Sequence, residues 1–234
     1  MPEFSGLTGV LYRISEWIMR FSVVNILWFM INLPIALILL SLYVHHFSMV
    51  FVLYYVPLIV LIPILFVPST VGLFAMARDW VLKKNHPSLT KAYFSYIKSN
   101  YKKSVLAGII LTFIWLIWIM DFYFFTSEND LLRVVFSIVG LVLFVFTINF
   151  FSLNVHLQMN NRELLKNTFF VTIGSPFLFF FILLSNFLLF YLSATKLIVL
   201  FPFFIGSISA YLSFAVFYRF SLKMQEKALI SKST

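Results

Sequence analysis

Six apolar stretches, separated by short polar segments, constrain the fold of this chain more than any other feature. They cover residues 21–44, 50–77 with an extension to 84, 104–125, 131–159, 176–194 and 197–218. Each is about as long as the roughly 20 residues that an α-helix needs to cross the hydrocarbon core of a bilayer. The pattern predicts an all-α membrane protein with six transmembrane helices in a single integral membrane domain, residues 1–234.

The composition supports a membrane protein and argues against a soluble one. Only 11% of the residues are charged and 62% are hydrophobic, whereas a globular domain carries about 25% charged residues. A net charge of +9 would suggest nucleic-acid binding in a soluble chain. In a membrane protein the same excess of Lys and Arg is a topology signal beside anionic lipid. We therefore expect the lipid bilayer as a partner and no nucleic acid.

The basic residues fall almost entirely on one side of the predicted membrane. Of the 17 Lys and Arg residues, only Arg133 and Lys196 belong to segments that would face the other side. Because cytoplasmic loops carry the excess of Lys and Arg, this distribution predicts a multi-pass protein of the cell (plasma) membrane with both termini in the cytoplasm.

Amphipathic stretches precede the first, third and fifth apolar stretches. Residues 5–20, 88–102 and 161–173 place apolar side chains at helical spacing opposite polar and charged ones, as in helices that lie in the membrane interface. The repeated order predicts three like-oriented hairpins, each an interfacial helix followed by two crossings. Residues 219–234 form a polar, basic tail, which we expect in the cytoplasm.

Prolines mark the second apolar stretch as an irregular helix. Pro57, Pro63 and Pro68 each remove a backbone donor, which predicts a kinked or broken helix. The helix should continue into water until Asn85-His86-Pro87 ends it, because a residue before proline disfavours the helical conformation.

Polar side chains within the apolar stretches are candidates for a functional site, because each is costly in lipid. Asn149, Ser152 and His156 fall at i, i+3 and i+7, which places them on one face of the fourth helix. Other stretches add Asn25, Asn32 and Asn186. These side chains either line a pathway for a neutral solute or form hydrogen bonds between helices. The absence of a charge at mid-membrane favours hydrogen bonding.

The sequence carries no signature of catalysis, and we expect neither an enzyme nor a bound cofactor or metal. It has no cysteine, and it lacks Ser-His-Asp, His-Glu-x-x-His and Gly-rich phosphate-loop motifs. His45 and His46 are too few ligands for a metal site. His86 and His156 have no nucleophile or carboxylate within reach in the sequence. Asp121 falls near the outer end of the third stretch, where water can solvate it.

Several passages are similar to one family of bacterial membrane proteins. They are Gly9-Val10-Leu11-Tyr12-Arg13, Asn25 with Leu27-Trp28, Pro34, Pro68 and Thr70, Leu73-Phe74-Ala75, Arg78, Trp80, Tyr93-Phe94, Tyr96 and Asn100-Tyr101-Lys102-Lys103-Ser104. In these residues the chain resembles the YesL-like family, over nearly its whole length and most densely in the first half. It departs from the family pattern in residues 67–71, where Gly-Pro-Ala-Thr-Ala is usual, and at Asp79, where a basic residue is favoured.

The resemblance implies a place in Gram-positive loci for carbohydrate uptake and breakdown, often near sugar permeases, and implies no reaction. One hypothesis is an accessory, assembly or regulatory partner of a carbohydrate-uptake system, which would bind a sugar permease or its ATPase. Its contact surface would consist of Arg78, Trp80, Lys91, Lys98, Lys102 and Lys103. The same basic segment would otherwise bind lipid headgroups. The alternative hypothesis is a transporter of a small neutral solute such as a sugar. The sequence leaves the oligomeric state open.

Overall fold

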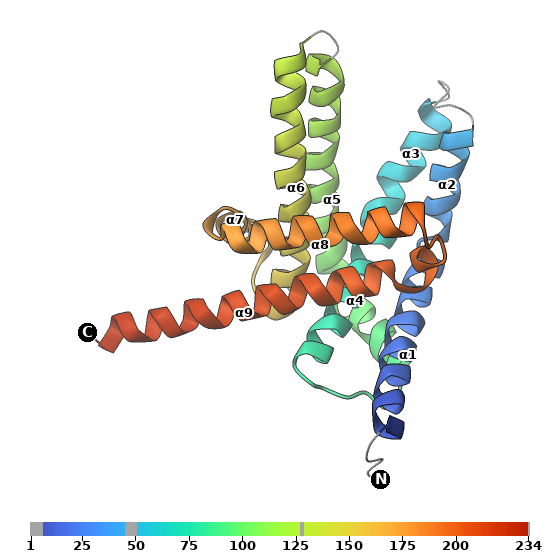
Figure 1. Ribbon diagram of the computed structural model, residues 1–234. Helices are drawn as coiled ribbons and strands as arrows, with labels where there is room; N and C mark the ends of the chain where they lie inside the picture. The colour runs from blue at the N-terminus through green and yellow to red at the C-terminus, as the bar shows by residue number, and fades with distance from the viewer. Residues whose placement is uncertain (1–6, 45–50, 127–128, 234) are drawn as a thin grey trace.

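The computed structural model describes residues 7–44, 51–126 and 129–233, and these residues form helices without β-strands (Figure 1). The helices are α1 (Leu7–Ile31), α2 (Leu33–Val44), α3 (Phe51–Leu61), the π-helical η1 (Ile62–Phe66), α4 (Val67–Val81), α5 (Leu89–Thr126), α6 (Asp130–His156), α7 (Asn161–Gly174), α8 (Pro176–Thr195), the π-helical η2 (Phe201–Ile205) and α9 (Gly206–Ser233). The predicted all-α class is confirmed.

Within the described ranges, six helical segments are long and apolar enough to cross a membrane. They are Gly9–Ile31, Tyr54–Val81, Leu89–Phe125, Asp130–His156, Pro176–Thr195 and Phe201–Glu226. The predicted number of membrane-spanning segments agrees with these helices. The bounds of the first segment differ, because Leu33–Val44 is a separate and shorter apolar helix.

Helix α4 lies at the centre of the molecule and packs against α1, α5, α6 and α9. Every residue from Val67 to Ala77 is buried, as expected for a helix that is apolar or small on all sides. Gly72 permits the close approach of α5, because a Cβ atom at this position would lie 2.7 Å from Ile97 Cγ1. The bulk of the apolar core forms around this helix.

Two predicted boundaries between an interfacial helix and a crossing are absent. Helix α1 runs without a break through residue 20, where we predicted the boundary between residues 5–20 and 21–44. It ends instead at Ile31, because Pro34 has no N–H to donate to the carbonyl of Met30. Helix α5 likewise joins residues 88–102 and 104–125 into one helix of 38 residues, about 57 Å long at about 1.5 Å per residue.

The other bounds lie closer to the sequence prediction. Helix α7 agrees with residues 161–173 to within one residue, and α8 agrees with residues 176–194 equally well. Helix α6 ends at His156 instead of continuing to residue 159. The basic tail from residue 219 is not a separate segment, since it continues α9 to Ser233.

Two of the prolines coincide with π-helical turns, whereas Pro57 lies inside α3 and Pro68 in the first turn of α4. Pro63 lies in η1, between α3 and α4, and Pro202 lies in η2, before α9. A proline cannot donate the usual backbone bond, and a π-helical turn is one way in which a helix accommodates such a residue. The irregularity predicted for the second stretch is therefore present as a local change of winding around Pro63.

The hairpins do not all point in one direction. Figure 1 shows the α2–α3 and α5–α6 hairpins extending the same way from the centre, whereas α8 and α9 run across them. Ser175 has an extended backbone between α7 and α8, and its side chain accepts a hydrogen bond from the backbone N–H of Leu178. This cap starts α8 in a new direction, and the arrangement of three like-oriented hairpins is not confirmed.

Candidate functional site

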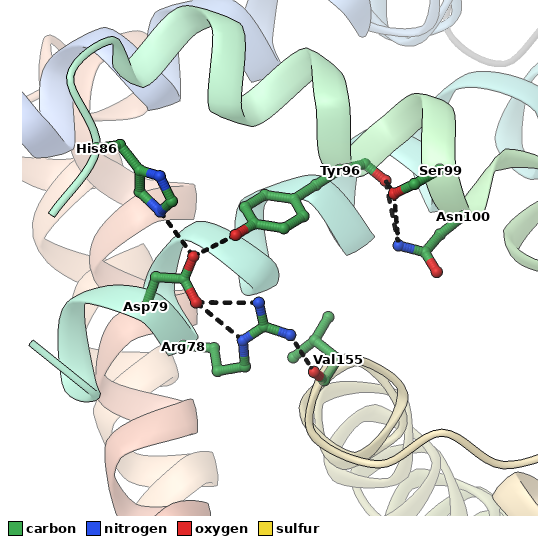
Figure 2. Close-up of polar contacts among 7 residues, drawn as sticks. All are labelled: Arg78, Asp79, His86, Tyr96, Ser99, Asn100 and Val155. Atoms are coloured by element: carbon green, nitrogen blue, oxygen red, sulfur yellow. Dashed lines mark hydrogen bonds and ion pairs between the residues drawn. The ribbon is translucent and has the colours of Figure 1, made fainter. Parts of the chain in front are cut away.

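A buried carboxylate lies where α4 ends and the loop to α5 begins (Figure 2). The Asp79 side chain is 0% exposed, and both of its oxygens accept hydrogen bonds. Oδ1 accepts from Arg78 Nε at 3.1 Å and Nη2 at 2.9 Å. Oδ2 lies 2.7 Å from His86 Nε2 and also accepts from the Tyr96 hydroxyl. We refer to Arg78, Asp79, His86 and Tyr96 as the Asp79 cluster.

Arg78 connects this cluster to the end of α6. Its Nη1 donates to the carbonyl of Val155 at 2.6 Å, one of the last carbonyls of a helix, which lack a partner within their own helix. Its guanidinium lies 5.4 Å from the centre of the Tyr96 ring, within the range of a cation–π interaction. The positive charge of Arg78 at the C-terminus of α6 also interacts favourably with the dipole of that helix. One side chain therefore contacts α4, α5 and α6.

The loop from residue 82 to residue 88 has the geometry that brings His86 to Asp79. Lys83 has a left-handed backbone, with φ of 57°, and the backbone N–H of Lys84 donates to the carbonyl of Asp79 at 2.8 Å. This tight turn reverses the chain. Asn85 accepts a hydrogen bond from Arg20 of α1 at 3.0 Å, so that the loop is bound from two sides.

The sequence prediction for His86 was wrong. We predicted no carboxylate within its reach, whereas Asp79 lies seven residues earlier and its Oδ2 contacts the imidazole. The turn at Lys83 creates this contact. At Asp79 the chain departs from the family pattern in the protein interior and not on its surface, because this residue is fully buried.

The chemistry of the cluster favours a structural role. The four hydrogen bonds at Asp79 leave its oxygens occupied by donors, so the carboxylate is poorly placed to take a proton from a substrate. In the part of the chain that the structure describes, no three His, Asp or Glu side chains gather as metal ligands. The cluster instead fixes the loop and the start of α5.

The predicted contact surface is only partly a surface. Lys91, Lys98 and Lys102 are exposed on α5, and Lys103 is half-buried. Trp80 is only 3% exposed and packs edge-on against Phe21, with ring centres 5.2 Å apart. Its indole cannot contact a partner, because the end of α4 lies inside the core. Arg78 likewise points into the Asp79 cluster, with 22% of its side chain exposed.

The lysines form one exposed line along α5. Lys91, Lys98 and Lys102 are separated by seven and four residues, a spacing that places them on the same side of a helix. The opposite side carries Tyr93, which is fully buried and donates its hydroxyl to the carbonyl of Ser69 on α4 at 3.1 Å. We call Lys91, Lys98 and Lys102 the α5 lysine line.

Asn25 and Asn32 each join α1 to another helix. The Asn25 amide donates to the carbonyls of Phe201 and Pro202 at 3.2 and 2.8 Å, and its Oδ1 accepts from the backbone of Ser207 at 2.9 Å. The Asn32 amide donates to Ser69 Oγ of α4 at 2.9 Å. Both side chains are buried, and their bonds connect separate parts of the chain.

The remaining polar candidates are divided among other helix pairs. Asn149 of α6 donates to Thr172 of α7 at 3.1 Å, and Ser152 donates within α6 to the carbonyl of Ile148. Asn186 of α8 donates to Ser213 of α9 at 3.2 Å. His156 packs against the aromatic rings of Phe214, Phe217 and Tyr218 of α9. The hydrogen bonds of the asparagines therefore join different pairs of helices, and they do not form one continuous polar line.

Three grooves on the molecule are lined mainly by apolar side chains. The first, of about 590 Å³, lies between α8 and η2, and the second, of about 430 Å³, lies between α1 and the start of α9. The third, of about 310 Å³, lies between η1 and α5. The polar candidates Asn25, Asn32, Asn149, Ser152, His156 and Asn186 line none of the three. Asp121 is half-buried near the end of α5, and His45 and His46 lie outside the described residues.

Sequence comparisons show similarity to proteins of unknown function. Residues 21–122 match the family described as protein of unknown function, DUF624. The chain is 25% identical over 227 residues to the uncharacterized protein YteU of Bacillus subtilis (strain 168), across 96% of this chain and 90% of YteU. It is 22% identical over 177 residues to the uncharacterized protein YesL of the same strain, across 75% and 73% of the two chains. No solved structure shows a significant match. The family match and the similarity to YesL confirm the resemblance of this chain to the YesL-like family of uncharacterised proteins.

Proposed function

We propose that this multi-pass membrane protein is an accessory partner of a carbohydrate-uptake system, which it binds through the α5 lysine line. The observation that carries the proposal is a fixed row of cations on one side of α5. Like charges four residues apart, such as Lys98 and Lys102, destabilise an isolated helix. An acidic partner surface would neutralise this repulsion and would associate faster because of the opposite charge.

The Asp79 cluster supports the proposal because it makes the lysine line rigid. Tyr96 lies between Lys91 and Lys98 on the same helix, and its hydroxyl is bonded to the buried carboxylate of α4. A surface that is already ordered loses less conformational entropy when it binds a partner. The cluster would thus present the lysines in a constant arrangement.

The partner class comes from the family resemblance and from the orientation expected for a basic surface. Cytoplasmic loops carry the excess of Lys and Arg, so we place α5's first half, together with both termini, in the cytoplasm. The resemblance implies proximity to sugar permeases. We therefore propose a permease or its cytoplasmic ATPase as the partner, and we assign no catalysis to this chain.

A pull-down from native membranes in gentle detergent, followed by mass spectrometry, tests the proposal. We expect a permease or ATPase component in stoichiometric amounts with the wild-type protein and its loss with Lys98→Glu/Lys102→Glu. Arg219→Glu/Lys223→Glu is a matched control, because these exposed residues on α9 have the same spacing and the same change of charge. Recovery of the protein alone, at a single oligomeric size, would exclude the accessory role.

A transporter of a small neutral solute is the second candidate. Two proline-containing π-helical segments, η1 and η2, interrupt apolar helices, and interrupted helices often form substrate sites in transporters. In that case Asn32→Ala/Asn149→Ala/His156→Ala should abolish sugar flux into vesicles. In an accessory protein the same three substitutions should reduce stability without changing partner recovery.

A further inference from the structure

A groove of about 430 Å³ runs along α1, between this helix and the start of α9. Its walls are apolar side chains of both elements. They are Val10, Ile14, Trp17, Ile18 and Phe21 of α1, Phe204 of η2 and Ile208 of α9. Arg13 lines the same groove and supplies a positive charge near one end. From Arg13 to Phe21 the groove follows α1 for about 12 Å at about 1.5 Å per residue.

The other charged residues of α1 have partners within the protein. Arg20 pairs with Glu16 one turn earlier, and it also donates to Asn85 in the loop before α5. Its guanidinium lies 5.6 Å from the centre of the Trp17 ring. Arg13 is exposed, and no carboxylate of the described residues pairs with it. Among the residues that the structure describes, its charge is therefore free for a ligand.

We propose that this groove binds one anionic phospholipid of the surrounding bilayer, with its phosphate at Arg13 and an acyl chain along Ile14, Ile18 and Phe21. The groove lies on Gly9–Ile31, a segment long and apolar enough to cross the membrane, so that lipid has direct access to it. The positive charge of Arg13 beside an apolar groove matches the anionic headgroup and the apolar acyl chains of a phospholipid. Basic pockets between membrane helices are known to select anionic headgroups.

Trp17 lines the groove, and its fluorescence provides a local measurement. The protein is reconstituted into nanodiscs that contain phosphatidylcholine with a small fraction of dibrominated phosphatidylglycerol or dibrominated phosphatidylcholine. The signal of Trp17 is taken as the difference between the wild type and Trp17→Phe. We expect half-maximal quenching at about fivefold less phosphatidylglycerol than phosphatidylcholine, the preference that one cation near an anionic headgroup provides.

Two substitutions test the contacts of the lipid headgroup and of the acyl chain separately. Arg13→Gln should make the two lipids equally effective, whereas the exposed control Arg219→Gln, with the same loss of charge, should keep the fivefold preference. Ile208→Trp in a Trp17-containing chain fills the groove and should weaken binding of both lipids, measured by competition with spin-labelled phosphatidylglycerol. Equal quenching by both lipids in the wild type, or an unchanged preference in Arg13→Gln, would overturn the proposal.

Discussion

Asp79→Ala removes the acceptor that binds α4, the following loop and α5 together. The substitution leaves the Arg78 guanidinium with the carbonyl of Val155 but without its carboxylate, in a position where only 22% of the side chain is exposed. Removing one partner of a buried ion pair costs about 3–5 kcal/mol. Because Arg78 keeps one hydrogen bond and some contact with solvent, we expect a loss of about 3 kcal/mol in the free energy of unfolding.

A double-mutant cycle with Arg78→Ala isolates the direct interaction. The double variant should lose less free energy of unfolding than the two single variants lose together, because neither charge is then left without its partner. Two hydrogen bonds join the guanidinium to Asp79 Oδ1, at 3.1 and 2.9 Å. Hydrogen bonds to charged groups contribute about 1.5–3 kcal/mol, and we expect a coupling energy in this range.

Denaturant titration of the purified variants in mixed micelles measures these free energies. Asp130→Ala serves as the control, because its carboxylate also pairs with an arginine, at 3.1 Å, but is 92% exposed. An exposed pair of this kind contributes little to stability. If Asp79→Ala were as stable as Asp130→Ala, the Asp79 cluster would not hold this part of the protein together.

Three further predictions concern helix contacts and the partner surface. Gly72→Ala should lower the thermal unfolding temperature, because the new Cβ would lie 2.7 Å from Ile97 Cγ1. Gly174→Ala is the control and should leave this temperature unchanged, because its new Cβ would meet no atom within 4 Å. Asn25→Ala leaves the carbonyl of Pro202 without its donor and should cost about 1–3 kcal/mol in the same denaturant titration. Partner recovery in the pull-down should fall between about 0.1 and 1 M salt, as the Debye length shortens from about 10 to 3 Å.

The membrane helices could be predicted because length and apolarity depend on local sequence alone. Their ends also depend on how charged side chains pair, which length and apolarity do not show. Charges at Arg13, Glu16 and Arg20 suggested that the amphipathic helix of residues 5–20 ended before the membrane. Glu16 and Arg20 instead pair with each other, and α1 continues past them. A spacing of four residues between opposite charges was the signal that could have identified this pairing.

The Asp79 cluster could be recognised only in part from the sequence. Arg78 and Asp79 lie in the last turn of α4. Such charges at the end of an apolar helix are costly unless they are paired, and this much was visible in the sequence. The contact with His86 depends on the left-handed turn at Lys83, a conformation that is uncommon for a lysine. No local pattern indicates such a turn, so the sequence alone predicts no carboxylate within reach of His86.

The loop of residues 82–88 allows a test of the cluster and of its side of the membrane together. Trypsin cleaves after Lys83 or Lys84 only when the surrounding backbone opens, because a folded loop that is bound at both ends resists proteolysis. Asn85→Ala/His86→Ala removes the bonds to Arg20 and Asp79, and we expect much faster cleavage in this variant than in the wild type.

The side of cleavage then tests the orientation. In sealed inside-out vesicles trypsin should cut the double variant in this loop, and in right-side-out vesicles it should not, because the basic segments are expected in the cytoplasm. Cleavage after Lys223, an exposed residue of α9, reports protease access in both proteins and corrects for vesicle sealing. Equal cleavage of the wild type and the double variant would show that these bonds do not hold the loop. Cleavage only in right-side-out vesicles would reverse the topology and remove the lysine line from the cytoplasm, where an ATPase could bind it.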